Sequence, residues 1–124
     1  MTVTSLFPIL ATPDLPRLVA FYEAALCGSV TYRFPHEDGG DAYVSLSLGG
    51  APLGIGRDAA ATSPAPADRI AIWCYVDDVD ATHAQVVEAG GASRQEPSDM
   101  PWGERVAQVH DPDGNLLHLA LQPT

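Results

Sequence analysis

One histidine, His118, interrupts an otherwise apolar run in the stretch VHDPDGNLLHLAL (109–121). An imidazole titrates near neutral pH, so this side chain could transfer a proton, ligate a metal ion or hydrogen-bond to a ligand. Side chains alternate between the two faces of a strand. Leu117 and Leu119 should therefore face the core, and His118 should point to the opposite side.

The polar turn before His118 indicates a hairpin. If Gly114 forms a bulge after this turn, Gln108 pairs with His118. In the same register, His110 pairs with Leu116. Gln108 and His110 would then share the face of His118, although His110 could also be a simple surface histidine at the end of the hairpin.

Aromatic side chains are expected to line a cleft between two sheets, and His118 is expected to point into the same cleft. In the strand predicted over residues 69–76, Trp73 and Tyr75 have the parity that faces this cleft. An apolar cleft with a few polar groups is the usual form of a small-molecule site. The alternative is that these rings only fill the space between two sheets and bind no ligand. The candidate ligand-binding residues are Phe7, Tyr43, Trp73, Tyr75, Trp102, Gln108, His110 and His118.

The candidate residues would be positioned by strands and helices whose order occurs twice in the chain. The first half is expected to contain a strand at 5–11, a helix at 12–28, a strand at 29–34 and a hairpin at 42–56. The second half repeats this order at 69–76, 77–91, 92–97 and 105–121. Asp14 and Asp78 are placed to cap the two helices, and Gly28 is placed to end the first. The pattern predicts an α+β fold made of two βαβββ modules.

The two modules, about 1–57 and 68–124, are expected to form a single domain joined by a linker at about 58–67. A chain of this length can bury a substantial core. His83 is expected to face solvent. The residues expected beneath the helices are Val44, Leu46, Leu48, Leu53 and Ile55 in the first module, and Ile70, Ile72, Cys74, Val76, Leu117, Leu119 and Leu121 in the second.

The composition narrows the classes of partner. Sixteen acidic residues against six basic ones, all arginine, give a net charge of −10, which disfavours nucleic acid and anionic membranes as partners. No apolar run is long enough to predict a membrane span. Two cysteines, Cys27 and Cys74, make no disulfide framework and favour a cytoplasmic protein. Cys27 has no functional explanation in the sequence.

Two stretches, PDLPRLVAFYEAAL (13–26) and WGERVAQVHDPDGNLLHL (102–119), together with the duplicated βαβββ order, resemble the vicinal oxygen chelate superfamily. Its members include glyoxalase I, bleomycin-resistance proteins, fosfomycin-resistance enzymes and extradiol dioxygenases. The resemblance covers essentially the whole chain. It implies two sheets that curl around a common cleft, helices on the outer faces, and a homodimer that completes the cleft.

The resemblance also implies where a metal would be held. Metal-dependent members use four strand positions, which fall here at Phe7, Ala71, Gly54 or Gly56, and His118. Only His118 carries a donor side chain, and one imidazole cannot replace the hydration shell of a divalent ion. We therefore expect neither a metal nor another cofactor. His110, His118 and Gln108 could make a fortuitous metal site only if a further ligand joined them.

The expected function is metal-free binding of a small aromatic or cationic molecule, as in antibiotic resistance or metabolite sequestration. The metal-free bleomycin-resistance-like members are the nearest in type. The sequence leaves open whether the protein is an enzyme. The alternatives are a glyoxalase-like lyase or isomerase, or a dioxygenase, with His118 as acid or base, and a scaffold that has lost its ligand.

Overall fold

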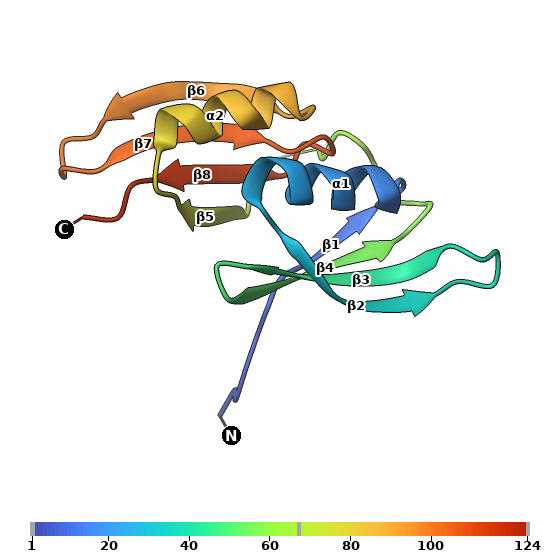
Figure 1. Ribbon diagram of the computed structural model, residues 1–124. Helices are drawn as coiled ribbons and strands as arrows, with labels where there is room; N and C mark the ends of the chain where they lie inside the picture. The colour runs from blue at the N-terminus through green and yellow to red at the C-terminus, as the bar shows by residue number, and fades with distance from the viewer. Residues whose placement is uncertain (1, 67, 124) are drawn as a thin grey trace.

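The computed structural model describes residues 2–66 and 68–123 and contains the βαβββ order twice (Figure 1). The first module consists of β1 (Ile9–Thr12), α1 (Leu15–Leu26), β2 (Ser29–Pro35), β3 (Asp41–Leu48) and β4 (Ala51–Arg57). The second consists of β5 (Ala71–Tyr75), α2 (Val79–Glu88), β6 (Ala92–Asp99), β7 (Arg105–His110) and β8 (Leu116–Ala120). The α+β class and the duplicated module are confirmed. None of the described helices is long and apolar enough to cross a membrane.

The two sheets have the same topology. Their strand orders are β1-β4-β3-β2 and β5-β8-β7-β6, and only the first pair in each order is parallel. In the first sheet Ile9 lies opposite Gly54, and in the second Trp73 lies opposite His118, at the same spacing of 64 residues. Gly54 is therefore the structural counterpart of His118.

Both helices begin as the sequence predicts. The side chain of Asp14 accepts a hydrogen bond from the Arg17 backbone N–H, and that of Asp78 accepts one from the Ala81 N–H, so each carboxylate satisfies a donor of the first turn. The first helix ends one residue before Gly28, at Cys27, which adopts the left-handed conformation with φ of 55°. Cys27 thus occupies a backbone position that usually favours glycine.

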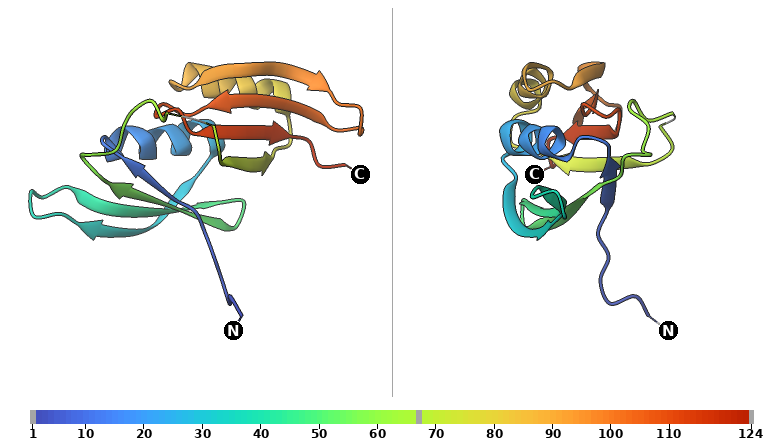
Figure 2. Two further views of the ribbon diagram at one scale, coloured as in Figure 1. Left: turned by 180° about the vertical axis from the view of Figure 1, so that it is seen from behind. Right: turned by 90° about the vertical axis from the view of Figure 1, so that its right-hand side faces the viewer.

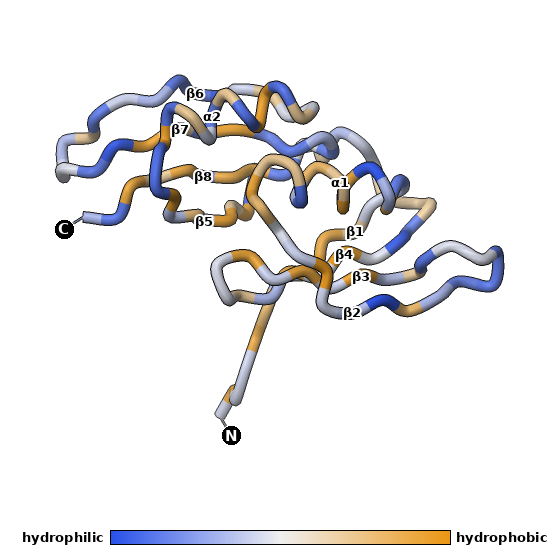
Figure 3. The backbone as a smooth tube through the Cα atoms, in the orientation of Figure 1, coloured by the Kyte–Doolittle hydropathy of each residue, from blue (hydrophilic) through white to orange (hydrophobic). Residues whose placement is uncertain are grey.

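One hydrophobic core runs through both modules. α1 packs on β3 and β4, α2 packs on β6, β7 and β8, and the two helices contact each other (Figure 2). The shared cluster includes Leu18 and Tyr22 of α1, Val86 of α2, and Leu46 and Leu117 of the two sheets. The chain is largely apolar along β4, β5 and β8, whereas the β2–β3 loop is hydrophilic (Figure 3). Burial of this shared surface is the main force that holds the modules together.

Each sheet buries one face under its own helix and leaves the other face open. In the first sheet Val44, Leu46, Leu53 and Ile55 are buried in the core. Tyr32, Phe34 and Tyr43 have the opposite parity and form what we call the first open face. In the second sheet Leu117 and Leu119 are buried, and Trp73, Tyr75 and His118 lie on the second open face. The predicted pairing of Gln108 with His118 and of His110 with Leu116 is confirmed.

Three expectations at the ends of strands and one within a helix are wrong. β1 begins at Ile9 rather than at residue 5, and the preceding residues extend away from the body of the protein (Figure 1). Ile70 and Leu121 are 85% and 46% exposed, because each lies just outside its strand and beyond the cover of a helix. His83 is buried, since its Nε2 atom lies 2.7 Å from the Ser93 hydroxyl oxygen on neighbouring β6.

The turn between β7 and β8 fastens the second module to the first. The buried carboxylate of Asp113 accepts hydrogen bonds from Thr12 Oγ1 at 2.5 Å and Ser63 Oγ at 2.9 Å, and it also pairs with the Arg17 guanidinium. Asp111 accepts one from the buried Tyr22 hydroxyl at 2.7 Å. Burial raises the pKa of Tyr22 well above its ordinary value, and the Asp111 carboxylate raises it further. The polar DPDG turn is thus a structural clamp.

Candidate functional site

The second open face carries a stacked pair of rings. The rings of Trp73 and His118 have centroids 5.1 Å apart and planes inclined by 19°. Tyr75 lies beside Trp73 in an edge-to-face contact at 6.2 Å and 74°. Trp73 and Tyr75 are 43% and 50% exposed, so both rings are accessible to a ligand. The structure therefore brings three of the predicted residues together.

Partial burial and a nearby arginine both influence the protonation of His118. Gln108 lies opposite it on β7, and the Gln108 side-chain oxygen accepts a hydrogen bond from the Arg94 guanidinium. Partial burial lowers the pKa of His118 below its ordinary value, and the positive charge of Arg94 lowers it further. The imidazole that stacks on Trp73 is therefore neutral at pH 7.

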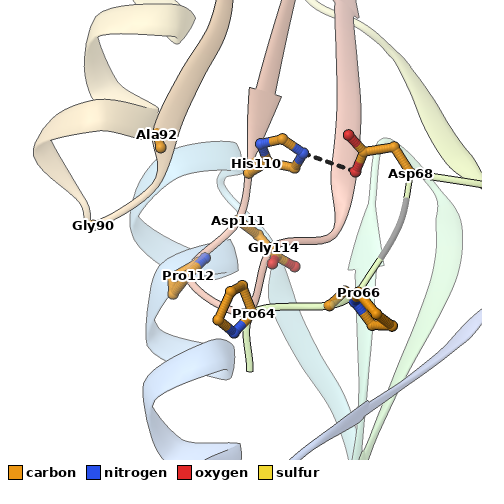
Figure 4. A pocket seen from close by; sticks show the side chains of 10 residues that line it. Pro64, Pro66, Asp68, Gly90, Ala92, His110, Asp111, Pro112 and Gly114 are labelled. Carbon is orange, nitrogen blue, oxygen red and sulfur yellow. Dashed lines mark hydrogen bonds and ion pairs between the residues drawn. The ribbon is translucent and has the colours of Figure 1, made fainter. Parts of the chain in front are cut away.

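His110 lies on the same sheet but belongs to a separate pocket. Its Nε2 atom is 2.8 Å from a carboxylate oxygen of Asp68, which comes from the segment before β5 (Figure 4). The Nε atom of Arg94 lies 3.3 Å from the other oxygen of Asp68. Three prolines complete the wall of this pocket, which has a volume of about 380 Å³: Pro64, Pro66 and Pro112. The structure thus pairs His110 with the linker.

Trp102 contacts Glu104, a residue that was not among the candidates from the sequence. Its indole Nε1 donates a hydrogen bond of 2.6 Å to Oε1 of Glu104, which is only 9% exposed. The Glu104 carboxylate is also the largest cause of a raised pKa at Tyr75. Glu104 precedes β7 with the parity of Val106 and Gln108, and this alternation was the signal that could have placed it on the second open face.

The remaining two candidates lie in the first module. Tyr43 is half-buried on the first open face, where its ring is 6.4 Å from that of Tyr32. Phe7 precedes β1 in the extended segment and is 45% exposed. Among the described residues, every contact between exposed aromatic rings joins side chains of one module. Tyr43 and Phe7 are thus not brought against Trp73 by a ring contact.

A larger cavity lies where the two modules meet. Trp73 and Tyr75 border it on one side, and Leu26 and Leu53 border it on the other. Asp77 adds a carboxylate to its lining. Its volume of about 670 Å³ falls within the range of clefts that hold drug-sized ligands. Ile72, Cys74 and Leu117 also line this cavity, so it lies toward the helix-facing side of β5 and β8.

Comparison with known families agrees with this architecture. The sequence profile described as "Glyoxalase/Bleomycin resistance protein/Dioxygenase superfamily" matches residues 4–119. The chain belongs to this superfamily. The resemblance inferred from the two sequence stretches is thereby confirmed.

Relatives of known sequence or structure support the same fold of the superfamily. A Mycobacterium bovis protein named "Putative glyoxylase CFP32" is 34% identical over 111 residues, which are 90% of this chain and 40% of that protein. This chain therefore spans less than half of that relative. TioX from Micromonospora sp. ML1 superposes with a TM-score of 0.77 at 24% identity, covering 98% of this chain and 100% of TioX. A bleomycin-binding protein complexed with bleomycin gives 0.69 at 24% identity, with 98% and 100% covered.

The four positions where metal-dependent members of the superfamily carry ligands are largely inert in this chain. Phe7 and Ala71 have no donor atoms, and Gly54 has no side chain. A Cβ atom at position 54 would collide with the Tyr43 hydroxyl group, so the space beside Gly54 is already occupied. In residues 2–66 and 68–123, no group of three or more His, Cys, Asp or Glu side chains is arranged to hold a metal ion. These four positions do not supply the set of donor side chains that a divalent cation requires.

Proposed function

We propose that the protein captures a small aromatic or cationic molecule against the second open face and does so without a metal. The observation that carries this proposal is the accessible stack of Trp73 and His118, with Tyr75 at its edge. Flat π-surfaces of this kind bind planar rings by offset stacking and bind cations by cation–π attraction. Capture of this type requires shape and charge complementarity but no reaction.

Charge supports the same class of ligand. The lowered pKa of His118 leaves its imidazole neutral, so the ring does not repel a cation. The net charge of −10 attracts positively charged molecules over the whole surface. A structural neighbour in the superfamily is a bleomycin-binding protein in complex with its drug. Two free cysteines, one of them exposed, are compatible with a reducing compartment, and we place this capture in the cytoplasm.

A second copy of the chain is part of the proposal. Each open face exposes large rings to solvent, with Tyr32 and Phe34 on one and Trp73 and Tyr75 on the other. Exposed apolar patches of this kind are typical of association surfaces. In a homodimer, the first open face of one chain would cover the second open face of its partner. Tyr43 would then join the ligand site from across the interface.

One observation favours an enzyme as the second candidate. The relative that is 34% identical carries the name of a glyoxylase, and a neutral imidazole at His118 can accept a proton. A catalytic histidine is usually oriented by a carboxylate. No carboxylate of the described residues is hydrogen-bonded to His118, and Asp68 is hydrogen-bonded to His110. Capture is therefore the better-supported function.

The test is a thermal-shift screen of aromatic and cationic compounds, followed by the variant Trp73→Ala. A ligand at 100 times its Kd adds about 2.7 kcal/mol to the free energy of unfolding. That corresponds to a rise in Tm of about 10 °C for a domain of this size. We expect Trp73→Ala to abolish the shift and Val87→Ala, an exposed change on α2, to preserve it.

Two results would reject capture in favour of catalysis. One is turnover of a glutathione hemithioacetal or a catechol that His118→Ala abolishes, with no shift in the binding screen. The other is about one Zn, Ni, Mn or Fe per chain in elemental analysis of the purified protein. The first would place His118 in a reaction, and the second would reject metal-free capture.

A further inference from the structure

We propose that Glu104, with the rings of Trp102 and Tyr75, forms a subsite that selects a ligand carrying a positive charge. This inference rests on the proposed capture function and makes it more specific. It assigns the charged group of the ligand to one carboxylate at one end of the second open face. The ligand class is an aromatic molecule that bears a protonated amine, whose N–H groups can donate to the carboxylate.

The state of the Glu104 carboxylate carries the argument. The residue is 91% buried, since only 9% of its surface is exposed. Its Oε1 atom accepts the hydrogen bond from Trp102. Its Oε2 atom is also buried and has no hydrogen-bond partner among the described residues. The Tyr75 hydroxyl lies close enough for the Glu104 carboxylate to raise its pKa, but it makes no hydrogen bond of normal geometry to Oε2. A buried carboxylate oxygen without a well-placed donor is costly, so this atom can accept a hydrogen bond from a ligand.

The arginines nearest to Glu104 along β7 and β6 are engaged elsewhere. Arg105, the next residue, donates to both carboxylate oxygens of Asp80 at 2.8 Å and to Asp99 at 3.1 Å. Arg94 contacts Asp68 and Gln108. Neither of these two guanidinium groups is therefore paired with the Glu104 carboxylate.

The groups around Glu104 are suited to a cation that retains apolar substituents. Aromatic ring faces attract cations, most strongly when water is excluded, and indole is the best of them. Tyr75 links the subsite to the stacked pair, because its ring contacts Trp73. The Glu104 carboxylate also keeps the Tyr75 phenol protonated by raising its pKa, so no second negative charge develops there. A ligand could thus stack its ring near Trp73 and place its charge near Glu104.

The experiment compares two phenols of equal shape and different charge, tyramine and 4-propylphenol, by NMR titration of the full chain. We expect the wild-type protein to bind the cation, whose ammonium N–H groups can donate to Glu104, about tenfold more tightly than the neutral isostere. Glu104→Gln keeps the shape of the side chain and should remove this preference while preserving the affinity for 4-propylphenol. Glu88→Gln, on the exposed side of α2, is the matched control and should change neither affinity.

The possible outcomes separate this subsite from the capture function. Equal affinity of the wild-type protein for the two phenols, or an equal loss of both in a folded Glu104→Gln protein, would overturn the subsite and preserve capture. Binding of neither phenol would overturn both proposals. If Glu104→Gln fails to fold, Glu104→Asp shortens the carboxylate without removing its charge, and an unchanged preference there would reject the subsite. If Glu104→Gln instead turns a dimer into a monomer and the wild type shows no preference, Glu104 pairs with the second chain.

Discussion

At the scale of single residues, the protonation of His118 controls what the second open face can hold. A neutral imidazole lies flat against the Trp73 indole as one more π-surface, whereas an imidazolium would add a positive charge next to the proposed cation site. Burial and Arg94 both disfavour that charge. The binding of a cationic ligand is therefore coupled to the titration of one side chain.

The first prediction concerns the pH at which His118 titrates. In an NMR titration of the ring protons, its midpoint should lie below the ordinary histidine value of about 6.5. The unfolded chain binds this proton more readily than the folded one, so stability should fall as pH drops from the ordinary value through the lowered one. Trp73→Ala should move the midpoint back toward the ordinary value. A wild-type midpoint above 6.5 would contradict the assigned environment.

Equivalent positions in the two modules have different surroundings, because their residue types differ. Gly54 and His118 occupy equivalent places in the two sheets, yet the first is filled by Tyr43 and the second by an imidazole. The family resemblance implied His118 for the last of these positions and left the first-hairpin position open between Gly54 and Gly56. The sequence could not predict that Tyr43 reaches over Gly54, because the contact depends on a side chain eleven positions earlier, across β3 and β4.

At the scale of elements, the β7–β8 turn does the most to join the modules. Asp113 accepts hydrogen bonds from the end of β1, from α1 and from the linker, and each partner lies at least 50 residues earlier in the chain. The turn residues are therefore under constraint from tertiary contacts as well as from local turn geometry.

The second prediction follows from this clamp. Asp113→Ala leaves the buried Thr12 hydroxyl without its acceptor and removes the partner of Arg17, so it should lower the free energy of unfolding by about 3 kcal/mol. Chemical denaturation monitored by tryptophan fluorescence measures this change. Asp77→Ala, at an exposed position before α2, is the control and should have little effect. Equal stabilities of the Asp113 and Asp77 variants would refute the clamp.

Features that depend on neighbours in the chain could be predicted from the sequence. Alternation and capping predicted both helix starts, most strand faces and the register of the last hairpin. Ile70 and Leu121 were misplaced because burial at a strand end depends on what another element covers. His83, within α2, was misplaced because its burial depends on contact with Ser93 of β6. The pairing of His110 with Asp68 was missed for a related reason, since it requires the path of the linker.

At the scale of the whole molecule, the two open faces set the expected assembly. Each face has a row of exposed rings that its own module does not cover. A homodimer would remove these rings from water and give each ligand site a second wall. The ligand site and the interface would then stabilise each other.

The third prediction tests this assembly. Light scattering at micromolar concentration should give twice the mass of one chain. Phe34→Glu places a charge on the first open face and should shift the protein toward monomers, because the carboxylate would be buried without a partner. Val87→Glu makes the same change on the exposed side of α2 and should leave the dimer intact. A monomer mass for the wild-type protein would reject the dimer.

The shared core and the Asp113 clamp have a consequence for how the protein could be divided. The linker contributes no strand to either sheet, and the modules are held by burial, by Asp113 and by the bond from Tyr22 to Asp111. Two polypeptides separated near Ala60 should therefore find each other and complement. The peptide connection would then act chiefly by keeping the halves at a high effective concentration. Co-expressed halves, each fused to one part of a split reporter, should give a reporter signal when they reassemble. A ligand that contacts both halves of the protein should increase this signal.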